Sequence, residues 1–445
     1  MSAQIYSLPE ELFVAIVTTE QEDRRARAVG LKLTGTVFKS EWALSHTCRR
    51  FRDAIVGAPA LWTLIDIRLD LWEFPGCVEI LKLYLQRSNG CHLSATLRSR
   101  TPEDHGFTKG LSEILLHVER LWKFAIILYT PSAAKVLAPL RDVGAPHLQN
   151  LEIVNIDDDL IGVGLFASGA PRLSFLRIDG LKLQLPAPSW TVALTHLELR
   201  KSQRVDDNSV LVAITAQCPS LVHLHIDLSW LRAEASHSRF YISTLKSLNI
   251  TTPRMHRELF PLSALIDLFE TPALAEFIIE GAHGDEIVDL FSSSSLPHAS
   301  FPALTTLSFI HISPCLHDFA ESFVDMQMCY PPSAVFPALS SLTLINQCST
   351  SHLVKDILGQ PWPQLKTLAL CPFPVDSVFG ADAFVAVGKV LRDTVRPDHN
   401  RRQRLPKLRL SPALLALEDW QDAGADVEVF DGVAVAESFQ RLYSY

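Results

Sequence analysis

One short apolar pattern, L-x-x-L-x-L, occurs nine times between residues 148 and 370. The copies are LQNLEI (148–153), PRLSFLRI (171–178), LTHLEL (194–199), PSLVHLHI (219–226), LKSLNI (245–250), PALAEFII (272–279), PALTTLSF (302–309), PALSSLTL (337–344) and PQLKTLAL (363–370). A weaker copy is RLWKFAI (120–126). The mean spacing of about 27 residues indicates an irregular array of structural repeats.

Each copy predicts a short strand whose apolar residues point into a shared core, with neighbouring strands stacked in parallel. Segments with helical signals lie between the copies, for example DDNSVLVAITAQC (206–218). The fold class we expect is therefore α/β: a solenoid with parallel strands on its concave face and helices on its convex face. Strand alternation places the residues between the leucines on the concave face. From these we predict a substrate-binding surface of Phe175, Arg177, Glu198, Arg200, His223 and His225.

The N-terminal segment has a different, helical pattern. Ser7 and Glu10 have the spacing of a capping box, so a helix is expected from Leu8 or Pro9. In this helix Leu12, Phe13, Ile16 and Val17 form two adjoining apolar rows, wide enough to face two partners.

A second apolar stripe, Leu44, Cys48, Phe51, Ile55 and Ala58, predicts one more helix ending at Gly57 and Pro59. Leu8, Leu61 and Trp62 are expected at the ends of this small module without burial inside it, which indicates a docking face.

LPEEL (8–12), LSHTCRRFRD (44–53) and PALW (59–62) resemble, in this order, the F-box of the expanded families of mushroom-forming fungi. The resemblance implies a three-helix F-box that binds a Skp-type adaptor and, through it, a cullin and RING ubiquitin ligase. Carried over by position, the adaptor contacts are Leu8, Pro9, Leu12, Ile16, Leu44, Cys48, Phe51, Leu61 and Trp62. Between the first two helices lies a charged insertion (19–41), which we expect to be a solvated loop or helix extension; the alternative is a regulatory or partner-binding role.

A helix followed by Cys218 and Pro219 and then the strand LVHLHI resembles a leucine-rich repeat of the cysteine-containing type found in F-box proteins. The domains expected are an F-box at 1–65, a linker and start of the solenoid at 66–119, and a leucine-rich-repeat solenoid with a C-terminal cap at 120–445. The function this implies is that of a non-catalytic substrate receptor in an SCF-type ubiquitin ligase. A protein-interaction scaffold whose degenerate F-box assembles no ligase is the alternative.

Composition limits the other partners. With 40 Lys and Arg against 49 Asp and Glu, the net charge of −9 disfavours nucleic acid and anionic membranes as partners. We find neither a secretory signal pattern nor a membrane-spanning apolar run, and the eight cysteines form no CxxC pair. The expectations are a cytoplasmic or nuclear protein with reduced thiols, no cofactor and no metal.

Two patterns leave an enzymatic alternative open. GVGLFA (162–167) fits the glycine spacing of a dinucleotide-binding turn, but it lies inside the repeat array, where a helix and turn between repeats are expected. His223 and His225 share a strand face and could ligate a metal, but no third ligand is nearby in the sequence.

Overall fold

The computed structural model describes most of the N-terminal half of the chain and the strand regions of the rest. The described residues are 9–28, 40–69, 76–102, 105–184, 191–200, 212–213, 216–227, 239–252, 262, 268–282, 301–312, 336–346, 364–371, 407–415 and 427–430. The chain divides into two compact units, Met1–Gln203 with Gln440–Tyr445, and Arg204–Phe439.

The first unit begins with a helical module, which consists of α1 (Glu10–Ala28), α2 (Ser40–Ser45), α3 (Arg49–Val56) and the 3₁₀ helix η2 (Pro59–Trp62). Its core includes Phe13 of α1 and Phe51 of α3, whose rings stack with centroids 4.5 Å apart. Ile55 of α3 and Leu61 of η2 complete this core with no exposed surface.

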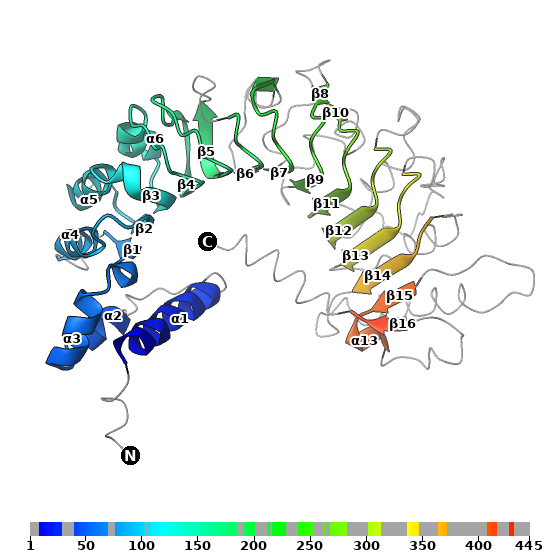
Figure 1. Ribbon diagram of the computed structural model, residues 1–445. Helices are drawn as coiled ribbons and strands as arrows, with labels where there is room; N and C mark the ends of the chain where they lie inside the picture. The colour runs from blue at the N-terminus through cyan, green and yellow to red at the C-terminus, as the bar shows by residue number, and fades with distance from the viewer. Residues whose placement is uncertain are drawn as a thin grey trace, which may run out of the picture. The chain divides into compact units, whose positions relative to one another are not determined.

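A parallel sheet follows in the same unit, and its strands are hydrogen-bonded in sequence order. The strands are β1 (Leu64–Arg68), β2 (Leu93–Ser99), β3 (Leu121–Leu128), β4 (Asn150–Gly164), β5 (Phe175–Gln184) and β6 (His196–Arg200). The connections contain α4 (Cys77–Arg87), α5 (His105–Leu115), η3 (Val118–Arg120), α6 (Ala133–Leu137) and η4 (Ala138–Leu140). Figure 1 shows α4, α5 and α6 on the same side of this sheet, as right-handed parallel crossovers require.

The second unit continues the same construction. Its parallel strands are β7 (His223–Asp227), β9 (Ser247–Thr251), β11 (Glu276–Glu280), β12 (Thr306–Ile312), β13 (Ser341–Asn346), β14 (Thr367–Cys371), β15 (Lys407–Leu410) and β16 (Val427–Val429). A separate parallel pair joins β8 (Phe240–Tyr241) to β10 (Phe269–Glu270), and the short helix α13 (Pro412–Leu415) follows β15. The described residues thus hold fourteen strands of long parallel sheet, six in the first unit and eight in the second.

The prediction of a strand at each L-x-x-L-x-L copy is confirmed. The second apolar residue of each copy lies in register with its counterparts, and in the second unit these are Leu224, Leu248, Phe277, Leu307, Leu342 and Leu368, all at most 2% exposed. The leucines are buried because parallel strands with helices on one side stack their inward side chains into continuous rows.

The structural repeat also includes a turn that precedes the first leucine of the copy. In eight copies the first leucine, or its equivalent, donates its amide hydrogen to the carbonyl three residues earlier, with N···O distances of 3.0–3.4 Å. The residue that supplies this carbonyl is buried each time: Ala145, Ala170, Thr191, Cys218, Ile242, Thr271, Phe301 and Phe336. The Cys-Pro pair at 218–219 is therefore one instance of a general turn position that accepts several side chains.

Two strands of the sheet precede the first copy of the repeat. The sheet already begins at Leu64, so β1 and β2 lie within or just before the segment predicted as linker and start of the solenoid. In their sequences, LIDIR and LSATLRS, buried and less buried residues alternate, but the full leucine pattern is missing. The L-x-x-L-x-L repeat therefore does not predict these two strands.

The single helix predicted from the stripe Leu44 to Ala58 is wrong, because the chain turns at His46 and Thr47 between α2 and α3. The hydroxyl of Thr47 donates to the carbonyl of Leu44 at 2.8 Å, and that of Ser45 to the carbonyl of Trp42, also at 2.8 Å. Such local bonds compete with helix continuation. In the insertion, the helix extension is confirmed as far as Ala28, where α1 ends, and residues 29–39 lie outside the described part.

The helix expected at GVGLFA is also wrong. Gly164 ends strand β4, and Phe166 has a left-handed φ of 46° in the turn that follows. A dinucleotide fingerprint needs its glycines to open a helix, so this segment lacks the required geometry. None of the helices in the described ranges is both long and apolar enough to cross a membrane.

Candidate functional site

The first candidate is the outer surface of α1. Phe13 and Val17 point into the helical module, with 7% and 3% of their surfaces exposed, whereas Leu12 and Ile16 are 53% and 56% exposed. The prediction that α1 carries two apolar rows is therefore confirmed: one row packs inside, and the other faces outward. An i, i+4 apolar pair held on a helix is a typical element of a docking surface.

The other predicted adaptor contacts lie at different depths. Pro9 is exposed at the start of α1, and Leu44, Cys48 and Phe51 are half-buried between α1, α2 and α3. Leu8 lies outside the described residues. Of the positions named from the resemblance, Pro9, Leu12 and Ile16 thus offer the most surface to a partner.

The expectation that Leu61 and Trp62 lie unburied at the end of the module is wrong. Neither side chain has any exposed surface. The Trp62 indole donates from Nε1 to the carbonyl of Ile55 at 2.8 Å, packs edge-on against the ring of Tyr84 and is covered by the guanidinium of Arg87 at 4.3 Å. Helix α4, which the sequence reasoning did not join to this module, supplies the missing burial.

A buried polar cluster escaped the sequence reasoning altogether. The Glu41 carboxylate is 1% exposed and accepts hydrogen bonds from the phenol of Tyr84 at 2.5 Å and the amide of Gln21 at 2.9 Å. The same amide donates to the carbonyl of Leu61 at 3.1 Å. This Gln21–Glu41–Tyr84 cluster connects α1, α2, η2 and α4, and a buried carboxylate is stable only with such donors. Gln21 and Glu41 are 20 residues apart and Glu41 and Tyr84 are 43 residues apart, so no local sequence signal could have found the cluster.

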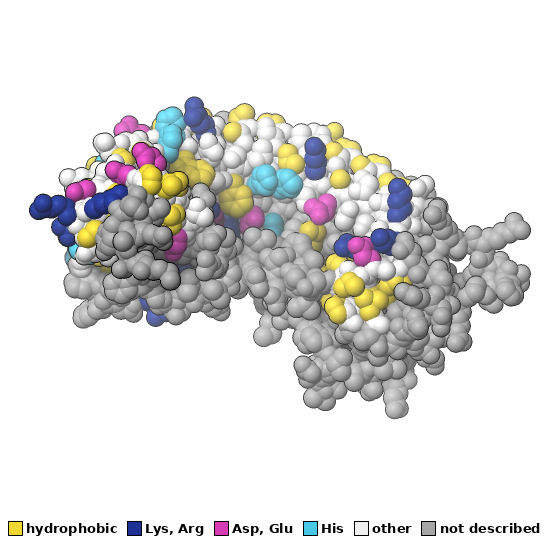
Figure 2. Space-filling view, turned by 60° about the horizontal axis from the view of Figure 1, so that its bottom comes forward, with side chains coloured by type: hydrophobic (Ala, Val, Ile, Leu, Met, Phe, Trp, Pro, Cys, Tyr) yellow, Lys and Arg dark blue, Asp and Glu magenta, His cyan; other side chains and the backbone are white. Residues whose placement is uncertain are grey.

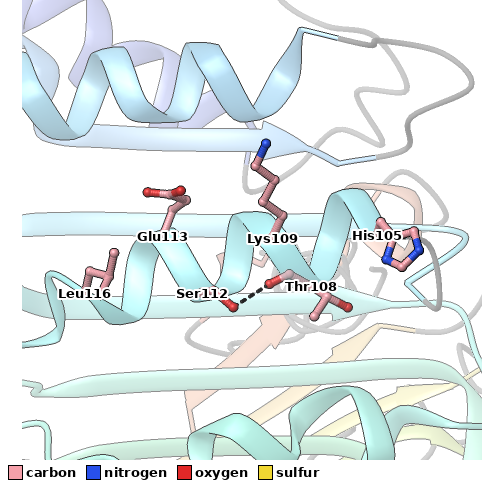
Figure 3. Close-up of a pocket in the computed structure, with 6 residues that line it drawn as sticks. All are labelled: His105, Thr108, Lys109, Ser112, Glu113 and Leu116. Carbon is pink, nitrogen blue, oxygen red and sulfur yellow. Dashed lines mark hydrogen bonds between the residues drawn. The ribbon is translucent and has the colours of Figure 1, made fainter.

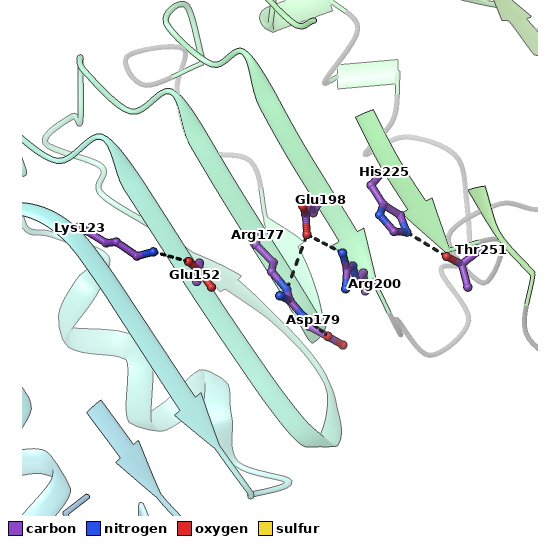
Figure 4. Close-up of polar contacts among 8 residues, drawn as sticks. All are labelled: Lys123, Glu152, Arg177, Asp179, Glu198, Arg200, His225 and Thr251. Atoms are coloured by element: carbon purple, nitrogen blue, oxygen red, sulfur yellow. Dashed lines mark hydrogen bonds and ion pairs between the residues drawn. The ribbon is translucent and has the colours of Figure 1, made fainter. Parts of the chain in front are cut away.

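The second candidate is the face of β3 to β6 that bears Lys123, Glu152, Arg177, Asp179, Glu198 and Arg200, here called the charged face (Figure 4). Glu198 Oε2 accepts from Arg200 at 2.8 Å and lies 3.7 Å from Arg177 Nε. Arg177 also pairs with Asp179 at 3.4 Å, and Lys123 with Glu152 at 3.1 Å.

Burial on the charged face is unequal. The two guanidinium side chains of Arg177 and Arg200 are only 5% and 7% exposed, whereas Glu152 and Glu198 retain 20% and 23%. Desolvated ion pairs of this kind contribute little net stability, but they hold each partner in one orientation. Glu198 is therefore held in place by Arg177 and Arg200, and Glu152 by Lys123.

Phe175 and His196 border the charged face at the start of β5 and β6. They are direct register partners with ring centroids 6.3 Å apart. Phe175 is half-buried and His196 exposed, and the imidazole Nδ1 of His196 lies 2.8 Å from the Thr195 hydroxyl. Phe175, Arg177, Glu198 and Arg200 of the predicted substrate surface therefore lie together in the first unit.

His223 and His225 belong to the second unit. His223 is exposed, whereas His225 is buried and its Nε2 lies 2.9 Å from the Thr251 hydroxyl (Figure 4). Within the described ranges, no group of three or more potential metal ligands occurs. The bonded, buried His225 is a structural side chain rather than an open ligand.

The corresponding positions between the core residues of the later strands in the second unit hold apolar side chains that are not on the surface. Ile310, Ile345 and Ala369 are 1–5% exposed and form a buried cluster with Ile278, Cys371 and Phe430. Tertiary packing within this cluster therefore removes these side chains from the surface.

The outer side of α5 forms a shallow depression of about 390 Å³ lined by His105, Thr108, Lys109, Ser112, Glu113 and Leu116 (Figure 3). The Ser112 hydroxyl donates to the Thr108 carbonyl at 2.8 Å, and Glu113 pairs with Lys82 at 3.5 Å. The Ser112 hydroxyl proton is thus engaged by a backbone carbonyl. On the face in Figure 2, basic and acidic side chains of the described residues are interspersed with hydrophobic ones.

No known protein family model matches this chain, and no curated protein matches it in sequence.

Proposed function

We propose that this protein is a non-catalytic substrate receptor of an SCF-type ubiquitin ligase. In this proposal α1, α2, α3 and η2 form an F-box that binds a Skp-type adaptor, and the adaptor links the chain to a cullin and RING ligase. The parallel strands with their connecting helices act as a leucine-rich-repeat solenoid that binds the target protein. Ubiquitin transfer is catalysed by the partners, in the cytoplasm or the nucleus.

The outward row on α1 carries this proposal. Leu12 and Ile16 are more than half exposed, the largest exposed fractions among the large apolar side chains of the described helical module. Burial of two such side chains by a partner would contribute about 1.5–3 kcal/mol each, before association costs. Together with exposed Pro9 they form a continuous apolar strip at the positions that the F-box resemblance assigns to the adaptor.

The experiment is a reconstitution with a purified fungal Skp-type adaptor, cullin and RING protein. Wild-type chain should retain adaptor and cullin together on an affinity resin. A Leu12→Glu, Ile16→Glu double variant should lose both, because two carboxylates would have to be buried at the contact. Both positions face outward, so this variant should keep the thermal stability of the wild type.

The matched control is Leu116→Glu, which changes a leucine that is 75% exposed beside α5. It should bind as the wild type does. The receptor function would be refuted if the wild type retained the adaptor without cullin, or if it retained neither protein.

The second candidate function is an interaction scaffold whose degenerate F-box assembles no ligase. The observation that favours it is the burial of Leu61 and Trp62, which leaves the adaptor fewer apolar contacts than the resemblance assigns. Adaptor binding without cullin in the same reconstitution would support this alternative.

A further inference from the structure

We propose that the charged face, together with Phe175 and His196, binds an arginine side chain of the target protein. The inference rests on the proposed function, because it takes the bound arginine to belong to a target protein. The inference specifies which chemical group the charged face binds, which the fold alone does not show.

The first step concerns which charges a partner can reach. Glu152, Arg177 and Glu198 are neighbours in register on β4, β5 and β6. Since Arg177 is 5% exposed and the two carboxylates are 20–23% exposed, an approaching group meets carboxylate oxygens before it meets a guanidinium. The accessible oxygens of Glu152 and Glu198 can accept hydrogen bonds from a cationic group at such a position.

The second step distinguishes the two carboxylates. The most exposed cation of the face, Lys123, is already paired with Glu152 at 3.1 Å. Glu198 has its Oε2 engaged by Arg200 at 2.8 Å, while its Oε1 makes no hydrogen bond or ion pair within the described part of the chain. Glu198 is thus a rigid carboxylate with an available oxygen.

The third step concerns the aromatic border. Phe175 lies directly opposite His196, which is two residues before Glu198 on the same strand face. Neighbouring strands are about 4.8 Å apart, so the Phe175 ring and the Glu198 carboxylate can contact one side chain together. A guanidinium suits this pair better than an ammonium does, because it is planar, stacks on aromatic rings and directs several N–H groups at a carboxylate.

The test is selection of a random dodecapeptide library, displayed on phage, against the purified full-length chain. Arginine should be enriched in the selected peptides. Replacing that arginine by glutamine in a synthetic peptide should weaken binding at least tenfold in fluorescence anisotropy. Glu198→Gln should weaken the parent peptide similarly, because it removes the charge and keeps the side-chain shape.

Two further variants complete the design. Phe175→Ala removes the stacking ring without touching the buried ion pairs, and it should also weaken binding several-fold. The matched control is Glu428→Gln in β16, which alters a carboxylate paired with Lys407 at 3.2 Å in the second unit and should leave affinity unchanged.

Enrichment of acidic or purely apolar peptides, of lysine in place of arginine, or affinity that is unaffected by both Glu198→Gln and Phe175→Ala would overturn the inference. The binding measurement contains no adaptor, so its failure is separable from failure of the receptor function. A chain that selects arginine peptides and retains no adaptor would keep the binding site and lose the ligase role.

Discussion

The Tyr84 phenol donates a 2.5 Å hydrogen bond to the Glu41 carboxylate and so ties helix α4 to helix α2. Both side chains are buried, at 1% exposure each. Through Gln21 the same carboxylate is linked to α1. The orientation of the helical module against α4 therefore depends on this polar cluster together with the packing of Trp62 against Tyr84 and Arg87.

Tyr84→Phe should lower the free energy of unfolding of the first unit by about 1–3 kcal/mol, because it leaves a buried carboxylate oxygen without its donor. Urea denaturation followed by circular dichroism measures this change. Tyr241→Phe, at a tyrosine that is 57% exposed, is the matched control and should have an effect of less than about 0.5 kcal/mol. Equal effects of the two variants would contradict the role of the cluster.

Trp62→Ala should destabilise the first unit by about 3–5 kcal/mol, since a large side chain without exposed surface leaves a cavity. Trp62→Phe should cost less, because the ring is retained and only the bond to the Ile55 carbonyl is lost. Thermal unfolding of the two variants checks the order. A wild-type melting temperature for Trp62→Ala would show that the indole is not a core residue.

Phe301→Ala should lower the unfolding free energy of the second unit by about 3–5 kcal/mol. Its ring lies between Phe277 and Phe336, with centroid distances of 5.8 Å and 6.3 Å, so one substitution interrupts a ladder across three repeats. Val429→Ala, at a residue that is 62% exposed, should have little effect in the same denaturation experiment. A small effect of Phe301→Ala would mean that this turn position contributes little to stability.

The Cys218 thiol should resist alkylation in the native protein. Burial raises its pKa from the usual 9.0 to about 12, because the thiolate is the form that loses solvation. At pH 8 the thiolate fraction is then about a thousandfold below that of an ordinary thiol, so iodoacetamide should modify half-exposed Cys91 much faster.

Peptide mass spectrometry after timed labelling gives both Cys218 and Cys91 rates, and unfolding in urea should equalise them. Because the pKa of Cys218 is raised in the folded state, ionisation of the thiol lowers the free energy of unfolding. The contribution of buried Cys218 is fully present below about pH 9 and is lost as the pH rises toward 12.

The sequence by itself determined the repeating strands. Each L-x-x-L-x-L copy supplies apolar side chains at short, fixed spacing, and burying them requires a neighbouring copy, so the repeat pattern predicts a parallel array. The same holds for α1, where the spacing of Leu12, Phe13, Ile16 and Val17 specifies an inner and an outer row.

Only the tertiary structure decided which apolar residues remain on the surface. Trp62 is buried because Tyr84 and Arg87 of α4 meet it from 22 and 25 residues away, and Ile310 is buried by a cluster that includes Phe430. The ion pairs of Glu198 likewise depend on the register of β5 and β6. Such contacts join side chains that are distant in sequence. The periodicity of apolar residues along the chain does not show which distant side chains come into contact.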